Sequence, residues 1–332
     1  MTRGNGQMWP TKKDVAATAG VSPATVTNVL TGRTRVREQT RRKVLAAVQE
    51  LDYSPHGPAQ ALRSGHNRTL GFCVPFSTNL TLSQTLRGAS QEAYAAGYVL
   101  SVCVMDYDVN LERDYLNAFA QQRVAAVIAL PASSDPHPYL RLQSARIPVV
   151  FVDHRPPGII ADVVGYDYRA GIQMAVQHLI KCGRRRVALL AIDAARRPDA
   201  AGVDGYRAAY SGAGLAIDES LITLDVISIA DAYNATHSLL LRGQPPDAFI
   251  AIGLLLMLGA MECLRRHGVR ISQDVSFVGT SDTVWTPLVE PPLTVIQVPG
   301  DELGRRATAM ALERVAQGGS PLPRARFVFP SV

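Results

Sequence analysis

Residues 11–32 read TKKDVAATAGVSPATVTNVLTG, and their capping residues predict two short helices joined by a tight turn. Thr11 can cap a first helix, and Gly20 can end it because glycine adopts the left-handed conformation without strain. Ser22 can cap the second helix with Pro23 in its first turn, where the missing N–H of proline is harmless. This stretch therefore predicts a helix-turn-helix, in which the second helix is the one that enters the major groove of DNA.

A third helix is predicted over residues 38–51, and apolar residues recur in all three segments at the spacing of one helix face. Three short helices with one apolar stripe each can enclose a small core. We expect this core to consist of Val15, Ala16, Ala19, Val26, Val29, Leu30, Val44, Leu45, Val48 and Leu51.

The positive charge of the chain is concentrated around these helices. The whole sequence has 332 residues and a formal net charge of +6. Residues 1–68 contain 11 Lys and Arg against 4 Asp and Glu, whereas the rest contains 23 basic and 24 acidic residues. A small basic segment on a nearly neutral body is typical of a protein that binds the phosphate backbone of nucleic acid. On charge alone, the alternative is a solvated basic tail.

Beyond residue 69 the apolar pattern changes to short strands that alternate with amphipathic helices. Strands are predicted at residues 70–75, 99–104, 125–130, 149–152, 187–190, 248–252 and 275–278. Helices are predicted near residues 83–96, 111–122, 169–181, 205–213, 230–241, 255–267 and 300–317. This alternation predicts an α/β body with parallel sheets that carry helices on both faces.

The head resembles that of the LacI family of transcription regulators, and the similarity continues over nearly the whole chain. The residues that carry it in the head are Lys13-Asp14-Val15-Ala16, Gly20-Val21-Ser22, Ala24-Thr25-Val26-Thr27, Leu30-Thr31-Gly32, Thr40-Arg41, Val44-Leu45 and Leu51-Asp52-Tyr53-Ser54-Pro55. The resemblance implies an all-α helix-turn-helix head and an α/β body of two doubly wound parallel-sheet lobes of the periplasmic-binding-protein type. It also implies a sequence-specific repressor that binds an inverted-repeat operator of double-stranded DNA as a homodimer. No heptad tail follows Phe329, so we expect a dimer rather than a tail-linked tetramer.

The same resemblance divides the chain into three parts. These are a DNA-binding head at residues 1–55, a hinge helix at residues 56–68, and an effector-binding and dimerisation body at residues 69–332. Within the body, the first lobe is expected at residues 69–164 and 296–322, and the second lobe at residues 165–295 and 323–332.

DNA contacts are expected from the head, chiefly its second helix, and from the hinge. The expected residues are Thr11, Ser22, Pro23, Ala24, Thr25, Thr27, Asn28 and Thr31 in the head, and His56, Ala59 and Leu62 in the hinge. Asn28 stands where the family usually has arginine, and asparagine suits adenine rather than guanine; the alternative is a phosphate contact only. The resemblance implies that Leu62 inserts between base steps in the minor groove, and the alternative is an apolar contact inside the hinge helix.

A small-molecule effector of unknown identity is expected in the cleft between the two lobes. By resemblance its contacts would come from Asn79, Leu82, Asp153, Arg155, Gly202, Gly253, Leu254, Ser281, Asp282 and Val298. Several of these differ from the polar residues usual in the family: Gly202 replaces an arginine, Gly253-Leu254 an Asn-Asp pair, Ser281 an aspartate, and Val298 a glutamine.

These differences remove most of the charged and amide groups that sugar recognition needs, since each sugar hydroxyl taken from water must be bonded again. We therefore expect an effector that is less polar than a sugar, or no small-molecule effector at all. At Gly202 the alternative is a shift of the alignment, in which case Arg196 or Arg197 takes the place of the family's arginine.

The remaining sequence offers no pattern for other chemistry. Its four cysteines lie far apart without a Cys-x-x-Cys pair, which argues against zinc and disulfides and fits a reducing cytosol. The seven histidines show no ligand spacing and no catalytic motif is found, so we expect no metal, no cofactor and no enzyme. Because neither a secretory signal nor a membrane-spanning stretch is found, we expect a cytoplasmic protein. A soluble ligand-binding protein is the alternative class, but the basic head argues against it.

Overall fold

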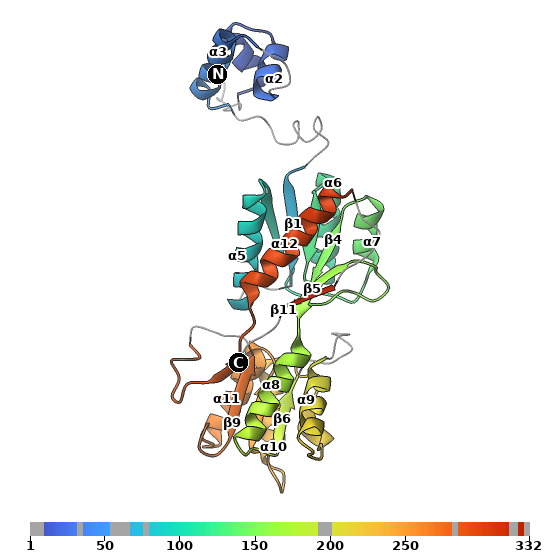
Figure 1. Cartoon of the computed structure of the whole chain (residues 1–332), viewed down its shortest axis with the longest axis vertical. Coiled ribbons are helices and arrows are strands. Elements are labelled where there is room, and N and C mark those ends of the chain that lie inside the picture. The colour runs from blue at the N-terminus through green and yellow to red at the C-terminus, as the bar shows by residue number, and fades with distance from the viewer. Residues whose placement is uncertain are drawn as a thin grey trace, which may run out of the picture. The chain divides into compact units, whose positions relative to one another are not determined.

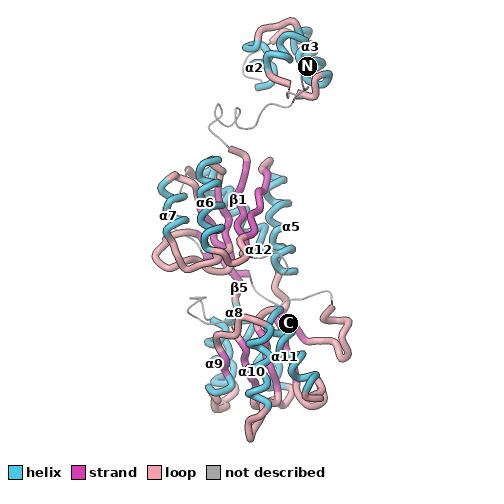
Figure 2. Tube along the Cα trace, turned by 180° about the vertical axis from the view of Figure 1, so that it is seen from behind, coloured by secondary structure: helices cyan, strands magenta, loops and turns pink. Residues whose placement is uncertain are grey.

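The computed structural model describes residues 10–31, 36–53, 67–75, 80–191, 201–280, 285–318 and 325–328. The chain forms two compact units, Met1–Asn67 and Arg68–Val332. Figure 1 follows the chain by residue number, and Figure 2 distinguishes its helices from its strands. The first unit is helical and the second is built from parallel sheets and helices, so the predicted fold class is confirmed.

In the head, the described residues form the helices α1 (Lys12–Ala19), α2 (Pro23–Thr31) and α3 (Glu38–Glu50). Their common core contains Val15, Ala16, Ala19, Val26, Val44 and Ala47. The expectation that Leu45 lies inside is wrong, because 43% of its surface is exposed and Ala47 is buried instead. Positions 44, 47, 48 and 51 recur three and four residues apart and share one face, whereas position 45 is turned about 100° away from position 44.

The first lobe of the body is a parallel sheet whose described strands have the order β11-β5-β4-β3-β1-β2. These strands are β1 (Thr69–Val74), β2 (Val99–Val104), β3 (Ala126–Ala129), β4 (Val149–Val152), β5 (Asp162–Tyr166) and β11 (Ala325–Val328). β1 lies inside the sheet, with Phe72 paired to Val102 on one side and to Ile128 on the other. β2 forms one edge of the sheet, which leaves one side of its backbone unpaired by this sheet.

The C-terminal strand β11 pairs with β5, from Ala325 opposite Val163 to Val328 opposite Tyr166. The assignment of residues 323–332 to the second lobe is therefore wrong for Ala325–Val328. β5 is also absent from the predicted strands, since its five residues include Asp162 and Gly165. Short segments of this kind become strands through pairing with their neighbours, which a local pattern does not reveal.

Helices cover both faces of this sheet (Figure 1). α5 (Leu80–Ala95) and α12 (Gly300–Ala316) share one core with Leu70, Phe72 and Val74 of β1. α6 (Val109–Gln122) and α7 (His137–Ser144) share the other core with Cys73. Successive residues of β1 thus enter opposite cores, which is why the strand is apolar throughout rather than alternating.

The second lobe repeats this arrangement, with its described strands in the order β10-β9-β8-β6-β7. The strands are β6 (Val187–Leu190), β7 (Ile222–Thr223), β8 (Ala248–Ala251), β9 (Ser276–Thr280) and β10 (Thr294–Ile296). α8 (Tyr168–Lys181) and α9 (Ala201–Gly212) pack on one face, and α10 (Ile229–Leu240) and α11 (Leu254–Arg266) on the other. None of the described helices combines the length and apolar character that a membrane span requires.

A buried ion pair ties α12 to β5 in the first lobe. The Arg314 guanidinium donates from Nε and Nη2 to the two carboxylate oxygens of Asp162, at 2.6 and 2.7 Å. The two side chains are only 8% and 2% exposed. The pKa of Arg314 is raised, mainly by its hydrogen bonds to Asp162. Such an ion pair stabilises the fold little more than apolar packing would, but the removal of one partner leaves the other charge buried without a counterion.

We predict that Asp162→Asn lowers the free energy of unfolding by about 3 to 5 kcal/mol, because the Arg314 charge then stays buried without its counterion. The measurement is the urea midpoint of the full chain. The matched control is Glu219→Gln, which breaks an exposed pair of the same two-bond geometry with Arg207, at 2.9 and 2.9 Å, and should leave the midpoint nearly unchanged. Equal midpoints for the two variants would contradict this interpretation of the buried pair.

Candidate DNA-binding surface and effector-binding residues

The turn between α1 and α2 is fixed by local hydrogen bonds. The Thr11 N–H and hydroxyl both donate to the Asp14 carboxylate at 2.7 Å, which completes the start of α1. These bonds, chiefly the one from the hydroxyl, lower the pKa of Asp14 below its ordinary value of 3.8. Gly20 ends the helix at φ 65°, and the next N–H, of Val21, donates to Ala16. The turn therefore sets the direction in which α2 leaves α1.

The predicted DNA-contacting hydroxyls of α2 have partners within the head. The Ser22 hydroxyl accepts from the Thr25 N–H at 3.2 Å and lies 3.0 Å from the Thr25 hydroxyl. The Thr27 hydroxyl donates to the Pro23 carbonyl at 3.0 Å and accepts from Lys12 Nζ at 3.1 Å. These residues thus cap α2 and connect it to α1, whatever contact they make with DNA.

Other side chains of α2 remain accessible to a binding partner such as DNA. Pro23 and Ala24 are exposed at the start of α2, and Asn28 is half-buried one turn further on. For Thr31 the structure describes only the place in α2. Outside the described residues lie the predicted hinge contacts His56, Ala59 and Leu62 and the predicted effector contacts Asn79, Ser281 and Asp282.

Most of the described candidate effector residues lie at the carboxyl ends of strands, where ligands bind sheets of this type. Asp153 follows β4, Gly253 follows β8, and Val298 follows β10. The Gly253 N–H donates to the Thr280 hydroxyl, the last residue of β9, at 2.6 Å. Thr280 was not among the predicted residues: the sequence shows a threonine shortly after the predicted strand 275–278, but its burial is a finding of the structure.

Gly202 on α9 has apolar surroundings. A Cβ atom at this position would lie 3.3 Å from Cδ1 of Ile252 and 3.6 Å from Cγ1 of Ile172. Gly202 is thus next to Ile252, the residue that directly precedes Gly253. Leu82 and Val298 are also buried, and Leu82 belongs to the core of the first lobe. Leu254 begins α11 and is half-buried. These positions therefore have apolar surroundings and provide no side-chain hydrogen-bonding group.

The polar candidates lie after β4. Asp153 has a left-handed backbone, with φ 69°, and its N–H donates to Val164 at 2.9 Å. Its carboxylate is 3.6 Å from Nδ1 of His154, a buried atom without a hydrogen bond among the described residues. Arg155 is exposed and donates to the Ala161 carbonyl at 3.2 Å. His154 is a residue that the sequence analysis overlooked, although it stands next to Asp153.

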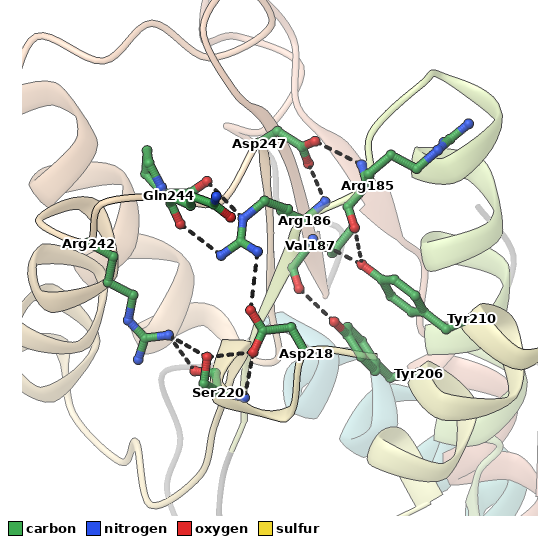
Figure 3. Close-up of polar contacts among 11 residues, drawn as sticks. Arg185, Arg186, Val187, Tyr206, Tyr210, Asp218, Ser220, Arg242, Gln244 and Asp247 are labelled. Atoms are coloured by element: carbon green, nitrogen blue, oxygen red, sulfur yellow. Dashed lines mark hydrogen bonds and ion pairs between the residues drawn. The ribbon is translucent and has the colours of Figure 1, made fainter. Parts of the chain in front are cut away.

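A polar network lies at the amino end of β6, the end opposite to the candidate effector residues. It connects β6 to α9 and to the loops that carry Asp218 and Asp247 (Figure 3). The Asp247 carboxylate accepts from the N–H groups of Arg185 and Arg186 at 2.8 and 3.0 Å. The Arg186 guanidinium donates to Asp218 at 3.2 Å, and the Tyr206 hydroxyl donates to the Val187 carbonyl at 2.8 Å. Burial is the main cause that raises the pKa of Tyr206. Because these groups bond to one another, they hold the lobe together and are not candidates for binding a ligand.

The chain is similar to known regulators over nearly its whole length. Residues 11–56 match the family described as "Bacterial regulatory proteins, lacI family", and residues 67–325 match "Periplasmic binding proteins and sugar binding domain of LacI family". The HTH-type transcriptional repressor PurR of Vibrio atlanticus is 31% identical over 308 residues, which is 92% of both chains. The ribose operon repressor of Escherichia coli is 29% identical over 308 residues, 92% of this chain and 93% of the relative.

Solved structures agree with this similarity. The transcriptional regulator CelR–cellobiose complex has a TM-score of 0.71 at 27% identity and covers 97% of this chain and 98% of its own. The Lac repressor dimer bound to operator and the anti-inducer ONPF has a TM-score of 0.83 at 24% identity, over 98% of this chain and 97% of its own, and so shares the fold. Head, body and sequence similarity lead to one conclusion: the chain belongs to the LacI family of bacterial DNA-binding transcription regulators.

Proposed function

We propose that the chain is a repressor that binds an inverted-repeat operator as a homodimer and responds to a small effector in its α/β body. The start of α2 carries the DNA-binding part of this proposal, because Pro23 and Ala24 are exposed on a capped helix. Helix-turn-helix proteins bring these first residues of the second helix to base edges in the major groove. The excess of basic residues at positions 1–68 would neutralise DNA phosphates on either side of the bases that α2 contacts.

Asn28 is the residue that we propose to set the base preference. It follows Ala24 by one helical turn, so the two side chains share a face of α2. An asparagine amide can bond N6 and N7 of adenine at once, and an alanine methyl can contact the methyl group of thymine. A family member with arginine at this position would favour guanine instead.

Selection of binding sites from random duplex DNA with the full-length protein should enrich an inverted repeat with an adenine at the base that Asn28 meets. In Asn28→Arg this base should become guanine, with a discrimination of about 1 to 3 kcal/mol, or roughly 5- to 150-fold. The control Lys43→Ala removes an exposed charge from α3 and should weaken binding to all DNA sequences alike. A guanine selected by the unmodified protein would rule out the role of Asn28.

Exposed apolar side chains along one edge of the first lobe support the homodimer. Val99 and Val102 on the edge strand β2 are 68% and 43% exposed. Tyr94 at the end of α5 and Tyr107 after β2 are exposed as well. Large apolar groups on an edge strand are characteristic of a surface that another chain covers. Two chains related by a two-fold axis would bring two heads to two half-sites, so we propose an operator with the same symmetry.

For the division of the chain, we propose a head at residues 1–55, a hinge at residues 56–68 and a body from residue 69 onward. The boundary between the two compact units, after Asn67, supports the start of the body. The proposal that Leu62 inserts into the minor groove depends on the family resemblance. Such insertion costs a few kcal/mol of base unstacking, which the contacts made on bent DNA offset.

The surroundings of the effector residues favour a ligand less polar than a sugar. Gly202 faces two isoleucines, and Gly253 has no side chain to offer. Gly253 also has φ 109° and ψ 153°, a conformation that costs other residues about 1 to 3 kcal/mol, so the asparagine usual in the family would be strained there. A site with few polar groups would leave most sugar hydroxyls without a hydrogen bond.

His154 favours a regulator with an effector over a regulator without one. Its Nδ1 atom is buried beside Asp153 and has no hydrogen bond among the described residues. The Asp153 carboxylate lies 3.6 Å from Nδ1, beyond hydrogen-bond distance. A buried polar atom without a hydrogen bond is unfavourable by about 1 to 3 kcal/mol, and a ligand with a single polar group would remove this cost. We therefore propose an effector that is mainly apolar and carries one group able to bond to His154.

Calorimetric titration of the full-length protein with D-ribose and with cellobiose should give dissociation constants weaker than about 1 mM, equivalent to about −4 kcal/mol. Small aromatic and aliphatic compounds should include ligands that raise the melting temperature of the unmodified chain and of His178→Ala, an exposed-site control, but not of His154→Phe. Micromolar binding of either sugar would overturn the proposed class of effector without affecting the proposed DNA-binding function.

A further inference from the structure

Three metal-ligand side chains meet on the second lobe, between α10 and α11. His237 belongs to the last turn of α10, Cys263 to the last turn of α11, and His267 directly follows α11. One ligand atom from each lies within 4.8 Å of the other two. Nδ1 of His237 is 2.9 Å from Nε2 of His267, and the Cys263 sulfur is 3.7 Å from Nδ1 of His267.

We propose that this cluster binds one transition-metal cation of the Zn²⁺ class and thereby joins α10 to α11. A thiolate with two imidazoles is a ligand set that favours Zn²⁺ and its neighbours over Mg²⁺ or Ca²⁺. Zn²⁺ takes nitrogen and sulfur ligands in a tetrahedral arrangement, and a site with three protein ligands leaves the fourth position to water. The site is separate from the DNA-binding head and from the candidate effector residues.

The hydrogen bonds of the cluster already orient the ligand atoms. Nδ1 of His267 lies 2.9 Å from the Cys263 carbonyl, which can only accept, so this nitrogen donates. Nε2 of His267 then presents its lone pair to Nδ1 of His237, and a single proton lies between the two nitrogens. A metal ion would replace that proton. Metal-binding histidines commonly donate their other N–H to a backbone carbonyl in this way.

The distances need only small adjustments to fit a tetrahedral ion. With Zn–N near 2.0 Å and Zn–S near 2.3 Å, neighbouring ligand atoms lie about 3.3 to 3.6 Å apart. The two imidazole nitrogens at 2.9 Å must separate slightly, and the thiol must approach. His267 is exposed, so its ring can turn without disturbing the core.

The surrounding helices provide a rigid and electrostatically suitable frame. α10 and α11 lie side by side (Figure 2), and Gly259 lets their backbones approach, since a Cβ there would lie 2.7 Å from that of Ala232. The C-terminal end of α11 favours a cation because it is the negative end of the helix dipole. The nearby Arg266 is paired with Glu262 at 2.7 Å and lies over the Tyr233 ring, which weakens its repulsion of a metal ion.

The sequence predicts no metal site, because its histidines and cysteines show no metal-ligand motif. Two of the three ligands were nevertheless visible, since Cys263 and His267 are four residues apart and share one helix face. His178 and Cys182 on α8 show the same spacing, with 3.8 Å between sulfur and Nε2, but the structure places no third ligand with them among the described residues.

Titration of the reduced full-length protein with Co²⁺ tests the site, because Co²⁺ reports thiolate ligation by a charge-transfer band and tetrahedral geometry by its visible bands. We expect one Co²⁺ per chain with both signals, and displacement by one equivalent of Zn²⁺. His237→Gln and His267→Gln should each weaken binding by at least about 10- to 100-fold, the loss typical of a disturbed metal shell. Cys263→Ser should abolish the charge-transfer band.

The matched controls are Cys182→Ser and His178→Gln, which remove the two-residue pair on α8 and should leave both signals unchanged. Circular dichroism checks that each variant is folded. If Cys263→Ser does not fold, the two histidine variants decide whether the cluster binds the metal. The proposal is overturned if the unmodified chain gives no charge-transfer band, if the band survives in folded Cys263→Ser, or if Cys182→Ser removes it. It is equally overturned if both histidine variants bind Co²⁺ as tightly as the unmodified chain.

Discussion

Burial of the parallel sheets on both faces is the constraint on which the body of this protein depends. Successive residues of a strand such as β1 must enter different cores, so each face needs helices to cover it. Covered faces leave only the strand ends open to a ligand. This explains why Asp153, Gly253 and Thr280 lie at strand ends although they come from different parts of the sequence.

Polar groups inside the lobes fall into two kinds. Arg314 and Asp162 bond to each other, and Glu112 accepts from the Tyr139 hydroxyl at 2.5 Å and from the Ala132 N–H at 3.0 Å. Satisfied groups of this kind fix helices and loops to the sheet, at little net gain over apolar packing. Nδ1 of His154 is of the other kind, since it is buried without a hydrogen bond among the described residues, and its burial is unfavourable until a hydrogen-bonding group meets it.

α11 connects two features with different chemistry. Its first turn follows Gly253, whose φ of 109° is a conformation that favours glycine, and its last turn carries Cys263 and leads to His267. Between these ends the helix is buried against the second sheet through Leu256, Met257 and Ala260. A rigid helix packed in this way holds both ends in place relative to the same sheet.

The uneven charge can be counted in the amino-acid sequence. The helices of the head and the alternation of strands and helices can also be predicted from it, because caps, turns and apolar periodicity act over a few residues. The sequence also indicated the candidate positions at the ends of strands. Two contacts become visible only in the folded chain: β11 pairs with β5, and His237 meets Cys263 and His267. These contacts depend on which distant segments pack together, and such packing produces no periodic pattern in the sequence of either segment.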